Sequence, residues 1–144
     1  MSFKSLSEML QTTKEMGKEI WEIVLSNEAA EQAVPQVTIF ENMRAMYTAM
    51  KNAHDHYDSR AKSLSKMAGG DGEKLKEYRL SGRNICGDFL AEVMETAVKM
   101  GESNACMKRI VAAPTAGSCG VLPAVFITYE RQRGVCEDTI VKAL

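Results

Sequence analysis

Apolar residues recur at intervals of three and four along most of this chain, and this spacing constrains the fold more than any other feature. The clearest stripe runs from Thr38 to about Met67 and contains Phe40, Met43, Tyr47, Met50, Tyr57, Ala61 and Leu64. Such spacing is typical of an amphipathic helix with one buried face. Methionine-rich stripes also occur in adaptable binding grooves, but we interpret this one as ordinary core packing.

The segments on either side of this stripe also predict helices. "SLSE" places Ser5 and Glu8 as a reciprocal cap for a helix from about Leu6 to Ala33, which Gly17 weakens. Pro35 either closes this segment or starts the next. Glycines in "MAGGDGEKLKEY" predict a sharp turn before a short helix from about Glu73 to Arg79.

Three further helices are expected towards the C-terminal end. One follows the stripe Ile85, Phe89, Val93, Ala97 and Met100, with Gly101 as its left-handed C-cap. "AVFITYERQRG" predicts a helix that ends at Gly134, although its β-branched and aromatic residues leave a strand open. "EDTIVKAL" predicts a last helix. We therefore predict an all-α fold of five or six helices, a multi-helix single domain over residues 1–144.

Composition excludes several functions. With 18 Lys and Arg against 19 Asp and Glu, no strong field recruits nucleic acid or an anionic membrane. The opening "MSFKSLSEML" lacks a signal-peptide core, so we expect a cytoplasmic protein. The four cysteines form no CxxC pair, so we expect free thiols that are mostly small buried packing groups, with no zinc site.

The segment "RIVAAPTAGSCGVLPA" is a Gly-rich loop between two apolar runs, which break at Pro114 and resume around Pro123. If Ser118 is the N-cap of the next helix, the amides of Cys119, Gly120 and Val121 point outward and form a seat for an anion. No lysine with Ser or Thr follows Gly120, which argues against a nucleotide-binding P-loop. A plain tight turn between buried segments remains an alternative.

Longer motifs around this loop resemble a known family. "RIVAAPTAGSCGVLPAV", the preceding "ESNACM" and the upstream "MAGGDGEKLKEY" are similar, in this order, to segments of the α chain of bacterial iron–sulfur-dependent L-serine dehydratases. The likeness extends from about residue 37 to the end. It implies an all-helical catalytic domain, of which residues 1–144 are the N-terminal part, that converts L-serine to pyruvate and ammonia without pyridoxal phosphate.

The resemblance also implies a cofactor and a partner. In the family a 4Fe-4S cluster, with one iron free of protein ligands, acts as the Lewis acid. The family's cluster cysteines lie downstream of Leu144, so we expect no metal ligand in this chain, no cluster bound by it and no activity on its own. The two-subunit form implies a separate β chain, in a homo- or hetero-oligomer, and exposed apolar surface for it.

The resemblance assigns site residues only where the motifs match. The expected loop for the carboxylate of L-serine comprises Thr115, Ala116, Gly117, Ser118 and Gly120. Asn104 and Lys108 are expected near it, and Gly69, Gly70 and Asp71 form a second wall. The base that removes the Cα proton stays unassigned.

Other chemistry-bearing residues have plainer interpretations. His54 and His56 stand two apart, project to nearly opposite helix faces and are interpreted as a solvated surface. Two other functions stay open. One is a helical interaction module, and the other is a redox sensor that depends on a depressed pKa of Cys119 at a helix N-terminus.

Overall fold

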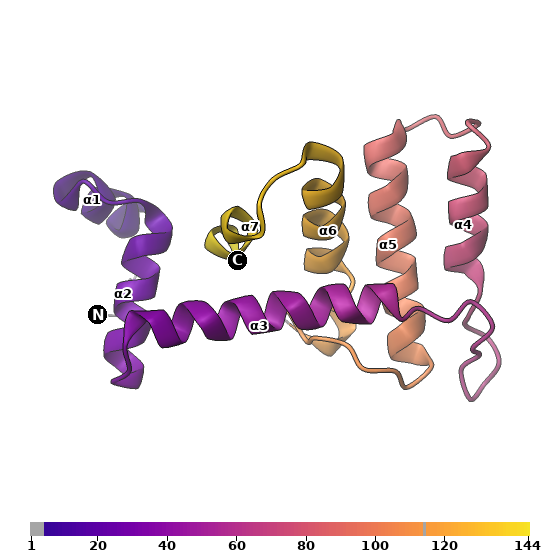
Figure 1. Cartoon of the computed structure of the whole chain (residues 1–144), viewed down its shortest axis with the longest axis horizontal. Helices are drawn as coiled ribbons and strands as arrows, with labels where there is room; N and C mark the ends of the chain where they lie inside the picture. Colours follow the sequence, from indigo (N-terminus) through magenta and orange to yellow (C-terminus); the bar gives the residue numbers. More distant parts are fainter. Residues whose placement is uncertain (1–4, 114) are drawn as a thin grey trace. The chain divides into compact units, whose positions relative to one another are not determined.

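The computed structural model of this chain describes residues 5–113 and 115–144 and is drawn in Figure 1. Every regular element in those residues is helical, which confirms the all-α prediction. The elements are α1 (Leu6–Met16), α2 (Ile20–Gln32), α3 (Gln36–Asp55), α4 (Asp71–Leu80), α5 (Asp88–Ala105), the 3-10 turn η1 (Ala116–Ser118), α6 (Val121–Arg133) and α7 (Glu137–Ala143). No described helix has the length and apolar character that a bilayer crossing requires. The predicted break at Pro114 lies outside the described residues.

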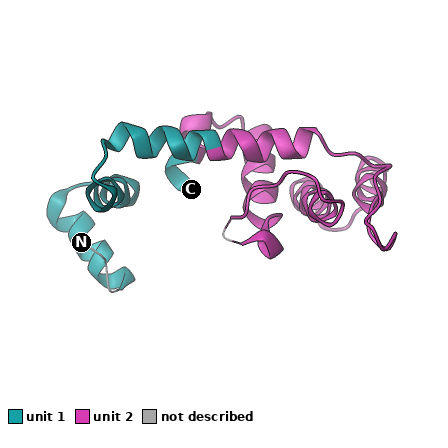
Figure 2. Ribbon diagram, turned by 90° about the horizontal axis from the view of Figure 1, so that it is seen from below, with its two compact units in different colours: residues 1–45, 141–144 teal, residues 46–140 magenta. Residues whose placement is uncertain are grey.

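Figure 2 shows that the chain divides into two compact units, residues 5–45 with 141–144 and residues 46–140. In the first unit the rings of Trp21 and Phe40 meet with their centroids 6.4 Å apart. The ammonium of Lys142 lies 4.7 Å from the centre of the Trp21 ring. These aromatic contacts, together with buried Ile23 and Ala29, form the small apolar centre of this unit.

The segment from Leu6 to Ala33, for which the sequence predicted one helix, forms the two helices α1 and α2. The side chain of Ser5 accepts a hydrogen bond from the Glu8 amide at 3.2 Å, as predicted for the start of α1. Gly17, at φ 60°, then ends α1 as its C-cap. The prediction of one helix from Leu6 to Ala33 is therefore wrong, because Gly17 adopts the left-handed conformation that ends a helix instead of merely weakening it.

The long helix α3 is shorter than its apolar stripe predicted. It ends at Asp55, so the helix predicted as far as Met67 is wrong in its last three turns, and Tyr57, Ala61 and Leu64 lie in a loop. The loop folds back on itself, because the Ser63 amide donates to the Ala68 carbonyl at 3.0 Å. Leu64 is consequently 93% exposed instead of packed in the core.

The second unit is built around α5, which packs against both α4 and α6 (Figure 1). Gly101 lies inside α5, and Cys106 takes the C-cap position, so the predicted cap at Gly101 is wrong. The helix continues past Gly101 to Glu102 and Asn104, whose side chains bond to segments that are distant in the sequence. These contacts favour a helical conformation at Gly101 despite the low helix propensity of glycine. Ile85 lies before the helix and is fully exposed.

The buried face of α5 is mostly polar. Glu95 is 4% exposed and accepts hydrogen bonds from Lys99 at 2.6 Å and from Arg79 of α4 at 2.9 Å. A carboxylate at this depth is tolerated because two cations compensate its charge. The apolar stripe therefore predicted the helix and its buried Met100, but not the polar residues that share the buried face. That face comprises Glu95, Thr96, Lys99, Met100, Glu102 and Ser103.

The second half of α3 also belongs to this unit and is held by a hydrogen bond to α6. The hydroxyl of Tyr47, which is fully buried, donates to Glu130 Oε2 at 2.6 Å. Burial and the neighbouring carboxylate raise the pKa of Tyr47, so its hydroxyl stays a donor at neutral pH. The predicted helix up to Gly134 is confirmed, since Gly134 caps α6 at φ 63°, and the strand alternative is excluded.

Removing the Tyr47 hydroxyl tests this contact. Tyr47→Phe should lower the free energy of unfolding by about 1.5–3 kcal/mol, because the lost hydrogen bond is buried and its acceptor is charged. Tyr78→Phe is the matched control, since the Tyr78 hydroxyl donates to the Arg83 carbonyl at an exposed position. It should cost less than about 1 kcal/mol. Urea unfolding followed by circular dichroism measures both, and equal losses would contradict the assignment.

Candidate functional site

The two segments singled out by the sequence motifs are both bonded to one turn of α5. Glu102 on that turn contacts the turn that contains Gly69, Gly70 and Asp71, and Asn104, two residues later, contacts the loop that contains Ala116. The structure therefore brings most of the predicted residues together around the C-terminal end of α5. We call residues 102–104 the α5 end turn.

The Gly69–Gly70–Asp71 turn depends on glycine for two different reasons. Gly69 has φ 125° and Gly70 has φ 86°, which side chains rarely tolerate. A Cβ on Gly69 would also collide with the Ala61 carbonyl. Lys62 Nζ donates to the Gly69 carbonyl at 2.5 Å and fastens the turn to the preceding loop. The Asp71 carboxylate faces Lys74 at 2.7 Å, so only the main chain of Asp71 faces α5.

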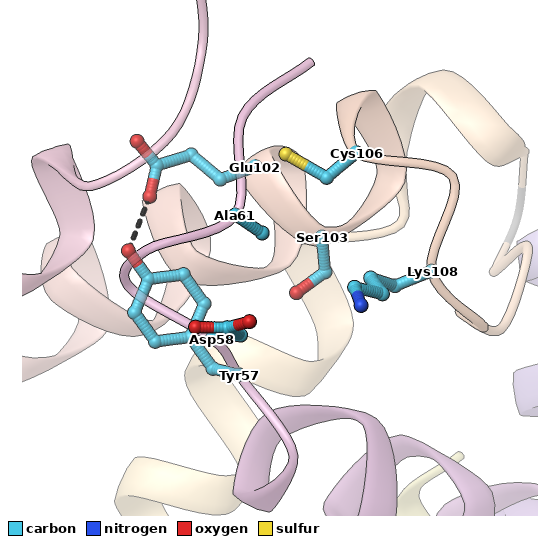
Figure 3. Close-up of a pocket in the computed structure, with 7 residues that line it drawn as sticks. All are labelled: Tyr57, Asp58, Ala61, Glu102, Ser103, Cys106 and Lys108. Carbon is cyan, nitrogen blue, oxygen red and sulfur yellow. Dashed lines mark hydrogen bonds between the residues drawn. The ribbon is translucent and has the colours of Figure 1, made fainter. Parts of the chain in front are cut away.

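Glu102 supplies the acceptor that the start of α4 lacks. Gly70, the N-cap of α4, has no side chain to accept from the first amides. Glu102 accepts instead, at 2.7 Å from the Asp71 amide and at 3.1 Å from the Gly72 amide, and also from the Tyr57 hydroxyl at 2.5 Å. Figure 3 shows the last of these bonds. The sequence analysis missed Glu102, although its place in "ESNACM", two residues before Asn104, was a usable signal.

These contacts decide the charge of Glu102. Its residue is 7% exposed. Burial alone would raise the pKa of Glu102, but the hydrogen bonds from Tyr57 and from the two amides outweigh burial and hold the pKa below its usual value. Burial and the adjacent carboxylate raise the pKa of Tyr57. The pair is therefore an ionised carboxylate and a neutral phenol at neutral pH.

The loop before α6 is organised differently from the prediction. Thr115 caps the turn η1, because its hydroxyl accepts from the Ser118 amide at 3.3 Å, and the Thr115 amide donates to the Ser118 hydroxyl at 3.3 Å. Gly120, not Ser118, is the N-cap of α6. The prediction that Ser118 caps this helix is therefore wrong, because Ser118 and Thr115 cap each other across η1. Asn104 Nδ2 donates to the Ala116 carbonyl at 2.9 Å and holds the loop to α5.

The two glycines of this loop have different roles. A Cβ on Gly120 would lie 2.8 Å from the Ala97 carbonyl oxygen, so Gly120 allows α6 to approach α5 closely. A Cβ on Gly117 would meet only the Thr115 hydroxyl, at 3.9 Å. Thr115, Ala116 and Gly117 are all exposed. Open space for a ligand is therefore found at Gly117, whereas Gly120 is needed for packing.

Lys108 lies on the side of the α5 end turn that Glu102 occupies. It lines a small depression, shown in Figure 3, whose other residues are Tyr57, Asp58, Ala61, Glu102, Ser103 and Cys106. Ser103 is 5% exposed and contributes a hydroxyl, and Lys108 contributes the cation. The depression therefore combines carboxylates with an ammonium and a hydroxyl.

The four cysteines are free thiols, as predicted, but only Cys119 is buried. Cys119 is 1% exposed and burial raises its pKa, which contradicts a redox sensor that needs a depressed pKa at Cys119. Cys86 and Cys136 are exposed and Cys106 is half-buried, so the expectation that most are buried is wrong. Each of these three lies at or beyond a helix end, where packing is incomplete. A hydrogen bond with the Thr139 hydroxyl lowers the pKa of Cys136.

The two histidines differ in burial, and the described residues hold no cluster of metal ligands. His54 is 8% exposed and lies 3.0 Å from Asp55, so the prediction of a solvated surface is wrong for His54, which is buried within the second unit, and holds for exposed His56. Burial lowers the pKa of His54. Within residues 5–113 and 115–144, no three His, Cys, Asp or Glu side chains gather as a metal site. These residues therefore do not fit the ligand set of a 4Fe-4S cluster.

Comparison with known proteins gives one consistent family. The family model described as "Serine dehydratase alpha chain" matches residues 15–144. The L-serine dehydratase alpha chain of Peptoniphilus asaccharolyticus is 35% identical over 92% of this chain and 46% of its own length. The probable L-serine dehydratase alpha chain of Bacillus subtilis is 28% identical over 99% of this chain and 47% of its own.

A relative with lower identity is also named an L-serine dehydratase, without the alpha-chain designation. The L-serine dehydratase of Helicobacter pylori is 27% identical over 87% of this chain and 28% of its own length. The chain thus spans about half the length, or less, of the curated relatives that it matches. No solved structure matches it.

The two loop glycines form a matched pair for mutation. Gly120→Ala should lower the free energy of unfolding by about 1–3 kcal/mol, because the new Cβ collides with the backbone of Ala97 and forces α6 away from α5. Gly117→Ala should change it by less than about 0.5 kcal/mol, because the space there is open. Urea unfolding distinguishes them, and equal destabilisation would show that the two glycines share one role.

Thiol reactivity tests the assignments of the cysteines. Near neutral pH, iodoacetamide should modify Cys119 at least about tenfold more slowly than Cys136, since Cys119 reacts only after local opening. Thr139→Val should slow the reaction at Cys136 by removing the hydrogen bond that stabilises its thiolate. Peptide mass spectrometry over a pH series follows each site. Fast modification of Cys119 in the folded chain would restore the redox-sensor hypothesis.

Proposed function

Because this chain belongs to the serine dehydratase alpha chain family, we propose that it forms part of an enzyme that dehydrates and deaminates L-serine. Elimination removes the Cα proton and the hydroxyl group of L-serine, and the aminoacrylate product hydrolyses to pyruvate and ammonia. The base for the proton stays unassigned. Within that reaction, these 144 residues contribute to binding of the substrate.

One observation carries the assignment of the binding residues. The α5 end turn is bonded both to the Gly69–Gly70–Asp71 turn and to the loop that contains Ala116, so the two family motifs form neighbouring walls of one region. A site for a small molecule needs such groups held in fixed relative positions. If the two motifs only formed the ends of separate helices, they would not need to bond to the same turn of α5.

The substrate carboxylate is assigned to the loop of Thr115, Ala116, Gly117, Ser118 and Gly120. The hydroxyls of Thr115 and Ser118 lie 3.0 Å apart and are mutually bonded, and each can turn its proton to a carboxylate oxygen instead. Exposed Gly117 leaves room for the ligand, Asn104 fixes the loop, and Gly120 acts indirectly through packing.

The remaining predicted residues surround the opposite side of the α5 end turn. Lys108 brings a positive charge to the depression beside Glu102 and adds a longer-range attraction for the carboxylate that the loop binds. Gly69, Gly70 and Asp71 form the second wall through their main chain. The carboxylate of Asp58 lies on the same side and suits the ammonium group of the amino acid.

In this proposal the cofactor of the reaction is held by residues other than the described ones. A 4Fe-4S cluster supplies the Lewis-acid chemistry in the complete enzyme when it is bound. The described residues of this chain do not gather as a metal site. Following the family resemblance, the ligands of the cluster are assigned to cysteines outside these 144 residues. This chain's own residues bind and orient the amino acid.

The proposal includes a partner. A separate β chain, in a homo- or hetero-oligomer, completes the enzyme in the cytoplasm, where it degrades L-serine and supplies pyruvate for gluconeogenesis. Apolar side chains at the surface support further protein contacts: Leu64, Met67, Ile85 and Met107 are 93%, 88%, 100% and 82% exposed. The same exposure favours the second candidate, a helical interaction module without a substrate.

Activity of the complete enzyme tests the proposal. The chain, extended to the length of its relatives and combined with a β chain, should form pyruvate from L-serine anaerobically after reconstitution with iron and sulfide. Thr115→Val and Ser118→Ala should each lower kcat/KM by about 10- to 100-fold, the size expected for lost hydrogen bonds to a charged group.

Thr12 on α1, a half-buried threonine whose hydroxyl donates to the Glu8 carbonyl at 2.9 Å, provides the control. Thr12→Val should leave kcat/KM unchanged. Calorimetry with L-serine and D-serine should show binding that both loop variants weaken. The interaction module is favoured instead if the loop variants bind the β chain normally and neither they nor the unmodified enzyme bind serine.

A further inference from the structure

Glu102 is the one buried carboxylate that the motifs did not assign and that contacts the proposed substrate walls in the described part of the chain. Its two carboxylate oxygens together accept three hydrogen bonds. Oε1 accepts from the Asp71 amide, and Oε2 accepts from the Gly72 amide and the Tyr57 hydroxyl. A carboxylate offers enough lone pairs for this arrangement without a competing donor of its own.

The contact replaces a helix cap that the sequence cannot provide locally. Because Gly70 has φ 86° and no side chain, the first amides of α4 have no acceptor on their own segment. The anion that meets them comes from Glu102, about thirty residues later in the chain. Glu102 therefore holds the α4 side of the glycine turn, while Lys62 holds its other side at the Gly69 carbonyl.

The position of Gly72 confirms how closely the carboxylate and the turn fit. A Cβ on Gly72 would lie 2.5 Å from Lys99 Cγ, 3.1 Å from the Tyr57 hydroxyl and 3.3 Å from Glu102 Oε2. Lys99 itself is turned away to Glu95, at 2.6 Å, so it does not neutralise Glu102. The donors that compensate Glu102 are the turn and Tyr57.

The same helical turn holds the other wall. Asn104 donates to the Ala116 carbonyl from a position two residues beyond Glu102. Displacement of Glu102 would rotate or unwind this last turn and would move Asn104 with it. The distance between the two walls is thus set by three consecutive residues.

We propose that Glu102 is a positioning residue for the amino-acid substrate, which fixes the Gly69–Asp71 turn relative to the loop of Thr115–Ser118 through the α5 end turn. This inference rests on the proposed function for its substrate, and on the contacts of Glu102 for the coupling. Glu102 does not itself need to touch the reacting atoms.

The variant Glu102→Gln tests the inference in the complete enzyme. Glutamine keeps the size and one acceptor oxygen but places an NH2 donor against the donors of Asp71, Gly72 and Tyr57. Amide hydrogen exchange should become at least about tenfold faster both at residues 71–72 and at residues 115–118, because charge-assisted hydrogen bonds are among the strongest in proteins. The KM for L-serine should rise at least about tenfold with kcat changed by less than about threefold.

Two further variants keep the test decisive. Glu77→Gln on the exposed face of α4 is the control and should change neither exchange nor KM. Tyr57→Phe removes only the hydroxyl bonded to Oε2, so it should shift exchange and KM in the same direction by a smaller factor, about threefold. This variant decides the matter if Glu102→Gln does not fold.

Each outcome has a defined meaning. A kcat that falls with the folded fraction at unchanged KM, or faster exchange at residues 71–72 without any change at 115–118, overturns the inference in favour of a local helix cap. If the unmodified enzyme does not convert L-serine while both segments still loosen in Glu102→Gln, the proposed function fails and the coupling is upheld. If it converts L-serine and the variant matches it in exchange and KM, only the inference fails.

Discussion

The second unit depends on the hydrogen bonds that the buried carboxylate of Glu102 accepts from two main-chain amides. Glu102 caps the N-terminus of α4 because Gly70 has no side chain that could do so. The Asp71 and Gly72 amides that it binds stabilise its negative charge. Removal of either partner would leave the other buried and unsatisfied, which is more costly than the bond is favourable. The carboxylate and the glycine turn therefore require each other.

The same principle extends along α5. Glu95, two turns earlier, is compensated by Lys99 and by Arg79 of α4, so the interface between α4 and α5 is held by ion pairs and hydrogen bonds as well as by apolar contacts. Buried polar networks of this kind add little net stability but permit only one register of the two helices. A fixed register is useful here, because it places the glycine turn at the end of α5 that also carries Asn104.

Family membership and geometry support the proposed function in complementary ways. The family supplies the reaction and the substrate class, while the structure supplies the relation between motifs that lie far apart in the sequence. The structure also separates roles within one motif. Gly120 brings two helices together, Gly117 leaves space, and Thr115 and Ser118 already satisfy each other across η1. A substrate at this loop must therefore compete with that internal bonding.

The sequence by itself determined the helices and the motifs, because helix periodicity, glycine caps and short turns depend on residues close together in the chain. It predicted α4, α6 with its cap at Gly134, and α7, and it identified the segments around Gly69 and Thr115. Only the tertiary structure decided that α3 ends at Asp55, that α5 continues through Gly101 and buries Glu95 beside Met100 of its apolar stripe, and that Glu102 joins the two motifs. Those outcomes depend on partners that lie tens of residues away, such as Arg79 for Glu95 and Asp71 for Glu102, and no local pattern specifies which distant donor will meet a buried charge.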